Sequence, residues 1–565
     1  MTLALGDDVI RQAVELHQPE LIICPFLKER LPEDLWRQHL CIIIHPGIRG
    51  DRGPSSLDWA IMNGEREWGV TALAAAAEMD AGDIWSSVTF PMRPGSKASL
   101  YRREVTQAGI QAILETIERF ESGTYRPEPL DYSNPDIRGE LRPSMKQATR
   151  AIAWECDTTA QIIQKIRASD SAPGVLDVID GREYYLYGAH AEGTLRGAQP
   201  GAILAQRHGA ICRATTDGAV WITHLKAKKL AEAAPGGCAV VRLHKAPTCK
   251  LPATMVLEPS LVAEVPEVPC ELFGAPADET WKEIWYEEAN GVGYLHFDFY
   301  NGAMSTPQCR RLQEAYREAL ARDIRVLVLM GGADFWSNGI HLNVIDAAMN
   351  PATESWHNIN AIDNIVRDVI VTDSVITVAA MWGNAGAGGV MMPLAADHVW
   401  ARAGAVLNPH YRSMGLYGSE YWTYLLPRRV GVAKALELTG TPLPLGTQKA
   451  LEIGLVDAIL PDDLAAYHAE VRARAEALAA SADFEQILEA KRQQRAFDEK
   501  VKPLAAYRVA ELQRMRLDFA GRSSYQGVTY HEARRNFVDK VKAVETAPYL
   551  AKHLQALPAK VASSG

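Results

Sequence analysis

Apolar and polar positions change their pattern several times along the chain. Up to residue 145, two apolar runs of strand length, PELIICPF and CIIIHPG, are each followed by a loop. Residues 99–121 then place apolar side chains at helical spacing on a polar background. This alternation predicts a first domain, residues 1–145, with an open α/β sheet and functional residues in the loops at its strand ends.

Residues 146–250 show short strands at close spacing. The helix-like TAQIIQKIRAS ends before the turn-like SAPG, and four short runs follow: REYYLYGAH, GAILAQ, AICRATT and AVWITHL. Short strands separated by glycine turns predict a small barrel-like β domain. Residues 251–280 are rich in proline, which predicts an extended linker.

A last region, residues 281–565, begins with the strand-like VGYLHFDF and IRVLVLM around the helix-like QCRRLQEAYREALA, which favours a βαβ unit. Beyond residue 461 the composition predicts helices. Residues 374–396 are uncharged over a length that could span a bilayer. Their glycines and proline would make a poor continuous helix, so we predict a buried strand, a glycine turn and a short helix. The expected fold class is multidomain α/β.

The composition excludes several classes of protein. With 565 residues, of which 47% are hydrophobic and 23% charged, the chain is expected to be globular with several domains. A net charge of −10 and a pI near 5.9 disfavour nucleic-acid binding. The eight cysteines form no CxxC or cysteine–histidine cluster at metal spacing, which predicts reduced thiols in a cytoplasmic protein without a metal site. The first residues, MTLALGDDVI, predict no signal peptide.

Two polar residues of the N-terminal region are candidates for catalysis. His45 follows one strand-like run directly, and Asp80 comes after another, GVTALAAA. If these strands are neighbours, the two side chains meet at a sheet edge, where an aspartate–histidine pair can manage a proton during attack on a carbonyl. Spacing alone favours the alternative, a loop histidine and a turn aspartate without a catalytic role.

The motifs of this region resemble the formyltransferase and formyl-hydrolase family that uses 10-formyltetrahydrofolate. The residues that carry the resemblance are His45, Arg52-Gly53, Trp59, Asn63-Gly64, Gly69-Val70-Thr71 and Asp80-x-Gly82-x-Ile84. Residues 150–250 are similar to the C-terminal β domain of methionyl-tRNA formyltransferases. The resemblance implies formyl transfer from 10-formyltetrahydrofolate with His45 and Asp80 as catalytic residues.

The resemblance also implies a cofactor site, to which we assign Phe26 and Ile43. Ile43 stands where the family has a catalytic asparagine, and the lost amide would have donated to a developing oxyanion. The chain reaches His45 after few residues, so the folate domain is expected to be short at its N-terminus.

Two turns of the C-terminal region contain glycines. GGADFWSNGIHLN follows IRVLVLM, and WGNAGAGGVMMPLAADHVW follows VITVAAM. Glycines allow close approach of a ligand to the backbone, and N–H groups at a helix start bind oxyanions. Side by side, the turns would form an oxyanion hole from the N–H groups of Ile340 and Gly388. Tight packing between strand and helix is the alternative. Neither turn matches a nucleotide-phosphate motif.

These motifs resemble the enoyl-CoA hydratase/isomerase (crotonase) superfamily over residues 281–460. FWSNGIHL, GAGGVMMPLAAD and LLPRRVGVAKALELTGTPLPLGTQKALEIGLVDAIL carry the resemblance. It implies a coenzyme A thioester site, to which we assign Asn301 together with the two oxyanion-hole residues. The two catalytic glutamates of the superfamily fall on Met391 and Tyr411, so ordinary hydration, which needs two carboxylates, is not expected.

Tyr411 and Glu420 are the candidates that replace these glutamates. A tyrosine hydroxyl and a carboxylate can exchange a proton with a bound thioester. The alternative is a buried tyrosine with a satisfied hydroxyl and a glutamate that stabilises a helix start.

The combination of the two modules resembles a family of nickel–iron (NiFe) hydrogenase maturation proteins. The resemblance implies an enzyme that passes a formyl group from 10-formyltetrahydrofolate to coenzyme A and releases carbon monoxide from formyl-CoA. The expected partners are small-molecule substrates and other hydrogenase maturation proteins, with no nucleic acid and no membrane. Two alternatives remain: a formyltransferase for a small amine or nucleotide sugar on an inert crotonase-like scaffold, and a non-catalytic protein that binds folate or coenzyme A.

Overall fold

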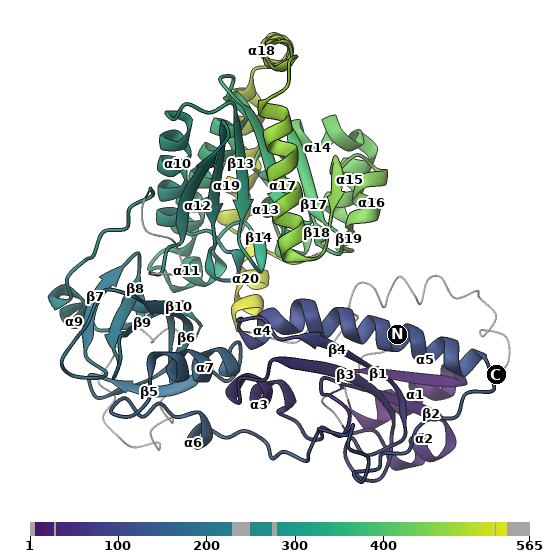
Figure 1. Ribbon diagram of the computed structural model, residues 1–565. Helices are drawn as coiled ribbons and strands as arrows, with labels where there is room; N and C mark the ends of the chain where they lie inside the picture. The colour runs from purple at the N-terminus through teal and green to yellow at the C-terminus, as the bar shows by residue number, and fades with distance from the viewer. Residues whose placement is uncertain (1–5, 28–29, 229–248, 274–279, 526, 540–565) are drawn as a thin grey trace. The chain divides into compact units, whose positions relative to one another are not determined.

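The computed structural model describes residues 6–27, 30–228, 249–273, 280–525 and 527–539. These residues form two compact units, of which the first ends at Val268 and the second begins at Pro269. Figure 1 labels their helices and strands.

The first unit begins with a four-stranded sheet in the order β1-β2-β3-β4. β1 and β2 are parallel, whereas β3 is antiparallel to both of its neighbours. Ile42 and Ile44 on β2 are buried against the helical layer, in which α5 packs on β3 and β4 (Figure 1). The elements are α1 (Asp7–His17), β1 (Leu21–Pro25), α2 (Glu33–Gln38), β2 (Leu40–His45), α3 (Ser56–Met62), β3 (Glu67–Ala74), β4 (Ile84–Pro91), α4 (Lys97–Leu100), a π-helical turn (Tyr101–Val105) and α5 (Thr106–Glu121).

The second part of this unit is an antiparallel sheet in the order β5-β6-β9-β8-β7. Its strands fall on the four short runs expected from the sequence, with β5 ahead of them. A capping box of Thr158 and Gln161 starts α7, whose isoleucines pack on the sheet. The elements are α6 (Gln147–Arg150), α7 (Thr159–Ser169), β5 (Val175–Ile179), β6 (Arg182–Glu192), β7 (Ile203–Arg207), β8 (Ala210–Ala214) and β9 (Ala219–Ala227).

The proline-rich segment differs from the predicted extended linker. β10 (Leu251–Pro252) pairs with β9, and α8 (Ala253–Val256) and α9 (Pro259–Glu264) follow. Leu251 and Ala253 are completely buried, and Ala253 belongs to the core of the β domain. Pro259 occupies the start of α9, where its fixed φ favours a helix. Buried apolar side chains therefore attach the first part of this segment, up to α9, to the first unit.

The second unit contains a six-stranded sheet in the order β11-β12-β13-β15-β17-β20. Every residue of β12, β13 and β15 is buried, as expected for parallel strands with helices on both faces. One face packs against a core that includes α10 and α12, and the other against α17 and α18. The strands are β11 (Ile284–Ala289), β12 (Val292–Phe297), β13 (Val326–Gly331), β15 (Ile376–Met381), β17 (His398–Arg402) and β20 (Ala458–Leu460).

A second, smaller sheet of this unit has the order β14-β16-β18-β19. Its strands are β14 (Phe335–Ser337), β16 (Asn384–Gly386), β18 (Val406–Asn408) and β19 (Leu445–Gly446). The two glycine turns therefore follow β14 and β16, not β13 and β15 directly as the sequence suggested. These strands are too short for a hydrophobic period to reveal them.

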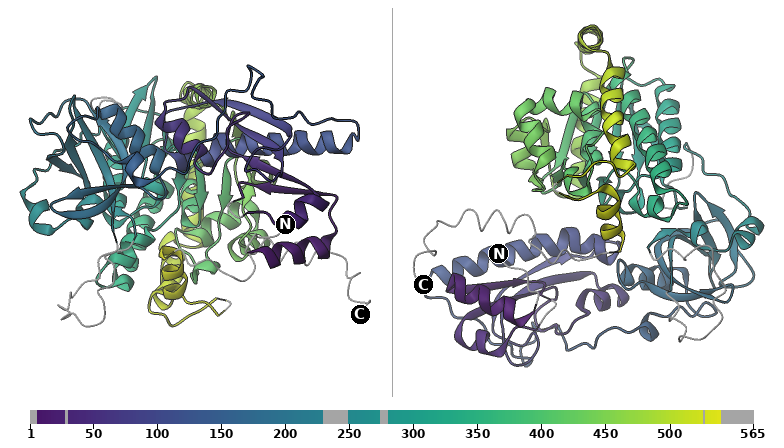
Figure 2. Two further views of the ribbon diagram at one scale, coloured as in Figure 1. Left: turned by 90° about the horizontal axis from the view of Figure 1, so that it is seen from below. Right: turned by 180° about the vertical axis from the view of Figure 1, so that it is seen from behind.

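Helices account for most of the remaining second unit, and α19 packs against both α12 and α14 (Figure 2). The helices are α10 (Thr306–Leu320), α11 (Leu342–Ala347), α12 (Pro351–Val371), α13 (Gly388–Met391), α14 (Trp422–Val430), α15 (Val432–Gly440), α16 (Thr447–Glu452), α17 (Leu464–Ala479), α18 (Phe484–Val501), α19 (Leu504–Phe519) and α20 (Tyr530–Val538). The helical prediction beyond residue 461 extends to residues 540–565, which lie outside the described part of the chain.

The uncharged stretch over residues 374–396 forms the predicted strand β15 and the predicted short helix α13, with the additional strand β16 between them. Within the part of the chain that the structure describes, no helix is long and apolar enough to cross a membrane.

Candidate functional site

His45, the last residue of β2, has a carboxylate beside each ring nitrogen. Its Nε2 lies 2.9 Å from Asp51 Oδ2, and its Nδ1 lies 3.4 Å from Asp80 Oδ2. The imidazole and the Asp51 carboxylate are both buried. The predicted His45–Asp80 pair is brought together, and Asp51 is a third member that the sequence interpretation missed.

The pair meets for a different reason from the one expected. β2 and β3 are neighbours but antiparallel, so His45 lies opposite Thr71 and the loop after β3 starts at the other end of the pairing. The loop folds back because the Gly53 N–H donates to Asp80 Oδ2 at 3.1 Å. Arg52 Nε also donates to the Met79 carbonyl at 2.8 Å.

Hydrogen bonds to the Pro46 carbonyl hold the loop after β2, which carries Asp51. The Ser56 hydroxyl and the Trp68 indole N–H both donate to the Pro46 carbonyl, at 2.7 and 3.0 Å. A Cβ on Gly47 would lie 2.4 Å from Asp51 Oδ2 and 2.5 Å from His45 Nε2. Glycine at this position therefore allows the histidine and the aspartate to meet.

The two predicted cofactor-binding residues of this unit have apolar surroundings. Ile43 lies two residues before His45 on the same face of β2 and packs on Cys24 and Cys41. The Phe26 ring contacts Tyr101 with centroids 6.0 Å apart, on the side of the sheet that carries α5. Their roles in cofactor binding stay predictions.

In the second unit, three turns come together because β14, β16 and β18 are adjacent and parallel. The turns lead to Ile340, Gly388 and Tyr411. A Cβ on Gly339 would lie 3.5 Å from the Gly388 nitrogen, which shows how close the first two turns are. Among the described residues, neither the Ile340 nor the Gly388 N–H has an intramolecular acceptor. Both donors are therefore available to an oxyanion.

Two other residues named from the sequence lie around these turns. The Asn301 carbonyl accepts a hydrogen bond from Asn338 Nδ2 at 2.8 Å, which places Asn301 beside the β14 turn. Met391 is completely buried in the core and provides no carboxylate.

The predicted Tyr411–Glu420 pair is formed. The Tyr411 hydroxyl donates to Glu420 Oε2 at 3.0 Å, and both side chains are buried. A Cβ on Gly388 would lie 2.0 Å from Glu420 Oε1, so the carboxyl group faces the first residue of α13. The pair thus lies beside the two available N–H groups.

Burial raises the pKa values of both members of the pair, but to different extents. It raises the pKa of Glu420 to about 8, with the nearby Asp363 as the second cause. Burial, followed by the charge of Glu420, raises the pKa of Tyr411 well above its usual value. Tyr411 therefore remains a neutral donor, and Glu420 changes its protonation near pH 8.

Two further carboxyl groups, Asp363 on α12 and Glu511 on α19, lie under this turn. Asp363 Oδ1 accepts from the Glu420 N–H at 2.9 Å, and Glu511 Oε2 accepts from the Tyr421 N–H at 3.0 Å. The sequence interpretation missed both. The available signal was a carboxylate on an otherwise apolar helix face, which for Asp363 includes Ile359, Ile362 and Val366.

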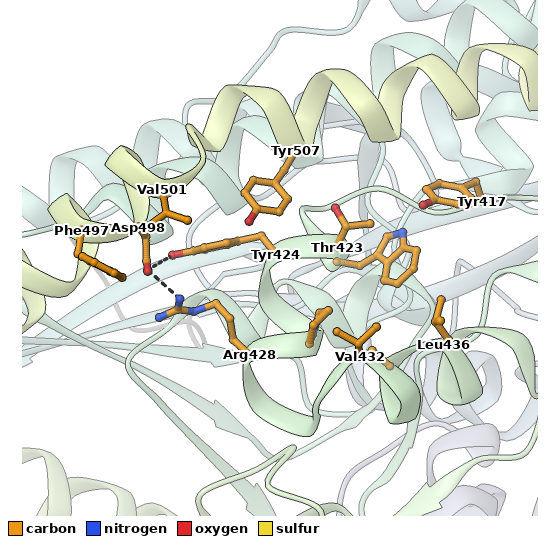
Figure 3. Close-up of a pocket in the computed structure, with 13 residues that line it drawn as sticks. Tyr417, Thr423, Tyr424, Arg428, Val432, Leu436, Phe497, Asp498, Val501 and Tyr507 are labelled. Carbon is orange, nitrogen blue, oxygen red and sulfur yellow. Dashed lines mark hydrogen bonds and ion pairs between the residues drawn. The ribbon is translucent and has the colours of Figure 1, made fainter.

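A cavity of about 510 Å³ adjoins this region between α14, α15, α18 and α19 (Figure 3). Aromatic and aliphatic side chains form most of its wall. Asp498 accepts a hydrogen bond from the Tyr424 hydroxyl at 2.8 Å and pairs with Arg428 at 2.9 Å. Thr423 lines the cavity, and its hydroxyl donates to Glu511 at 2.5 Å, so the cavity wall touches the buried carboxyl groups.

Three family models match successive parts of the chain. They are formyl transferase over residues 3–117, formyl transferase C-terminal domain over residues 144–235 and enoyl-CoA hydratase/isomerase over residues 288–543. A methionyl-tRNA formyltransferase of Geobacter metallireducens is 29% identical over 32% of this chain and 57% of its own length.

Two relatives match nearly the whole chain. The hydrogenase maturation factor HoxX of Bradyrhizobium diazoefficiens is 46% identical over 98% of this chain and 92% of its own length. The crystal structure of HypX from Aquifex aeolicus in complex with tetrahydrofolic acid has a TM-score of 0.89 and 43% identity, over 98% of this chain and 93% of that one. These matches confirm the predicted fold class.

Gly388→Ala should displace the Glu420 carboxyl and break its hydrogen bond with Tyr411. The new Cβ cannot coexist with Oε1 in its present position, and overpacking a buried site typically costs ~1–3 kcal/mol. Hydrogen exchange of amides in the second unit measures this loss of stability. Gly440→Ala is the matched control, because the nearest atom to its new Cβ is 4.0 Å away. Equal stability of the two variants would contradict the packing described for Glu420.

Proposed function

The chain belongs to the HypX/HoxX family of hydrogenase maturation factors, and from this we propose that it makes carbon monoxide for the active site of a nickel–iron hydrogenase. A formyl group passes from 10-formyltetrahydrofolate to the thiol of coenzyme A, and the resulting formyl thioester breaks down to carbon monoxide and the free thiol. The tetrahydrofolic acid bound to the HypX of Aquifex aeolicus supports a folate donor. Other hydrogenase maturation proteins are the proposed partners.

The observation that carries the proposal is the arrangement around Glu420. A carboxyl group with a tyrosine donor faces Gly388, beside N–H groups that have no acceptor within the described part of the chain. A formyl thioester has no α-carbon, so this substrate cannot form an enolate at the site. The remaining task is to move one proton and release a thiolate.

At the first site, we assign proton transfer to His45. The imidazole takes the thiol proton as sulfur attacks the formyl carbon, and it returns the proton to the folate nitrogen when the carbon–nitrogen bond breaks. The proton moves at Nδ1. Asp51 accepts a hydrogen bond from the Nε2–H group and holds the ring, and Asp80, 3.4 Å from Nδ1, stabilises the positive charge that forms there. Coenzyme A supplies only the accepting thiol.

At the second site, the N–H groups of Ile340 and Gly388 bind the thioester oxygen. The Glu420 carboxylate takes the formyl proton, and the electrons of the carbon–hydrogen bond stay on carbon as the lone pair of carbon monoxide, while an oxygen lone pair completes the triple bond. The carbon–sulfur bond breaks with its electrons on sulfur, and sulfur takes the proton back from Glu420. Tyr411 donates a hydrogen bond to the carboxyl group throughout and keeps its own proton.

Asp80→Asn should abolish folate deformylation but leave coenzyme A binding unchanged, because the two assigned sites lie in different units. General acid–base groups typically contribute ~10²–10⁴ in rate, and Asp51→Asn should fall in the same range. Liberated tetrahydrofolate is the measurement. Asp83→Asn is the control, since Asp83 is exposed in the same loop. Wild-type turnover in both site variants would remove this proton-transfer site from the proposal.

Carbon monoxide release from supplied formyl-CoA should increase as the pH rises through about 8, because Glu420 acts as a carboxylate and its pKa is raised to about 8. Glu420→Gln should lower the rate by ~10²–10⁴ and abolish this dependence. Tyr411→Phe should move the midpoint to higher pH, because its hydrogen bond lowers the pKa of Glu420. A rate that falls between pH 7 and pH 9 would mean that Glu420 is not the base.

A further inference from the structure

Asp363, Glu420 and Glu511 form one buried cluster of acids. The side chains of Asp363 and Glu511 are completely buried, and Glu420 is 2% exposed. The Ser419 hydroxyl lies 3.0 Å from both oxygens of Asp363 and 3.4 Å from Glu511 Oε2, so it bridges the two helices. Three carboxyl groups from separate elements thus share one hydrogen-bonded region.

The cluster has little positive charge to balance it. Arg508 Nε lies 3.6 Å from Asp363 Oδ2, and this guanidinium also donates to Asn360 and Asn364. Two other titratable groups interact with Glu420: Tyr411, which remains neutral, and the buried Cys309 thiol, whose pKa is also raised by burial. Full ionisation of the three acids would leave uncompensated buried charge, which is strongly unfavourable.

The three acids of the cluster therefore differ in pKa and lose their protons at different pH values. Burial raises the pKa of Asp363 to about 6, while the Arg508 charge opposes this rise. It raises the pKa values of Glu420 and Glu511 to about 8, and the charge of Asp363 adds to both. Near pH 7 the negative charge resides mainly on Asp363, beside Arg508.

Asp363 and Glu511 also hold the turn that orients the Glu420 side chain. Glu420 and Tyr421 have φ values of 58° and 56°, a left-handed conformation that residues with a Cβ atom disfavour. Asp363 accepts the N–H of the first, and Glu511 accepts the N–H of the second. Glu511 Oε1 also accepts the Thr423 N–H at 2.8 Å.

We propose that Asp363 and Glu511 are positioning residues that set both the orientation and the protonation of Glu420. The inference rests on the proposed function for its purpose. Glu420 must take a formyl proton and then return it to a thiolate, and proton transfer in both directions is most efficient when the two acids are of similar strength. A free thiol has a pKa of roughly 8.5, far above that of an ordinary carboxyl group. The neighbouring acids bring the pKa of Glu420 towards that of the thiol.

The test is a pH titration of Glu420 in the full-length protein, followed by infrared difference spectroscopy. The carbonyl stretch of a protonated buried carboxyl group reports its titration, and the Glu420 band is identified by its loss in Glu420→Gln. In Asp363→Asn the amide still accepts the Glu420 N–H but carries no charge. The Glu420 midpoint should therefore fall by about one pH unit. Glu511→Gln, on α19, should also lower the midpoint of the Glu420 titration.

Asp368→Asn on α12 is the matched control, because its carboxylate pairs with Arg317 at 2.8 Å outside the cluster. It should leave the Glu420 midpoint unchanged. Unchanged midpoints in both Asp363→Asn and Glu511→Gln would overturn the inference, and Glu511→Gln decides the matter alone if Asp363→Asn does not fold.

Carbon monoxide release separates this inference from the proposed function. In Asp363→Asn the midpoint of the pH dependence of carbon monoxide release should fall by about one unit, as in the infrared titration, and the limiting rate at high pH should also fall because the Glu420 carboxylate is then a weaker base. A merely structural role would give a slower enzyme with an unchanged pH profile. A shifted infrared midpoint with no matching shift in carbon monoxide release would support the inference and contradict the role of Glu420 as base.

Discussion

The parallel pairing of β14, β16 and β18 is the constraint on which the second site depends. Each strand has only three residues, yet their pairing places the ends of all three strands on one edge. Two of the following turns present backbone N–H groups, and the third leads to Tyr411. A backbone oxyanion site does not depend on side chains, so the proposed thioester site needs no glutamate at Met391 or Tyr411, where the superfamily has its two.

Burial of charge then decides which chemistry the site can perform. Glu420 faces Gly388 from a left-handed turn that is held by acceptors on α12 and α19. The acceptors are themselves acids, so the contacts that orient the turn also raise the pKa of Glu420. Position and proton affinity are consequences of the same packing.

The long buried strands and most helices could be predicted because their signals are local. CIIIH and VITVAAM are continuous apolar runs, and the periodic helices need no tertiary information. The short strands of the smaller sheet carry too few residues for a period. The segment at Leu251 was misjudged because proline content indicates a turn or linker, whereas here apolar burial and a proline at a helix start determine its structure.

The site could be predicted only where a motif marked it. His45, Asp80 and the turns around Ile340 and Gly388 lie in such motifs, and the Tyr411–Glu420 pair lies in one segment. Asp51 reads as an ordinary loop aspartate, and its contact with His45 depends on the fold of the loop around Gly47. Asp363 and Glu511 lie far from Glu420 in the sequence, and only the packing of α19 on α12 and α14 brings them together.

The central claim is that the formyl carbon becomes carbon monoxide. The most direct measurement supplies 10-formyltetrahydrofolate labelled with ¹³C in the formyl group, together with coenzyme A, and traps the gas on a haem protein whose infrared spectrum distinguishes ¹³CO. The account predicts labelled carbon monoxide in a one-to-one ratio with the tetrahydrofolate released, and none without coenzyme A. Label recovered only as formate or as a formylated amine would contradict it.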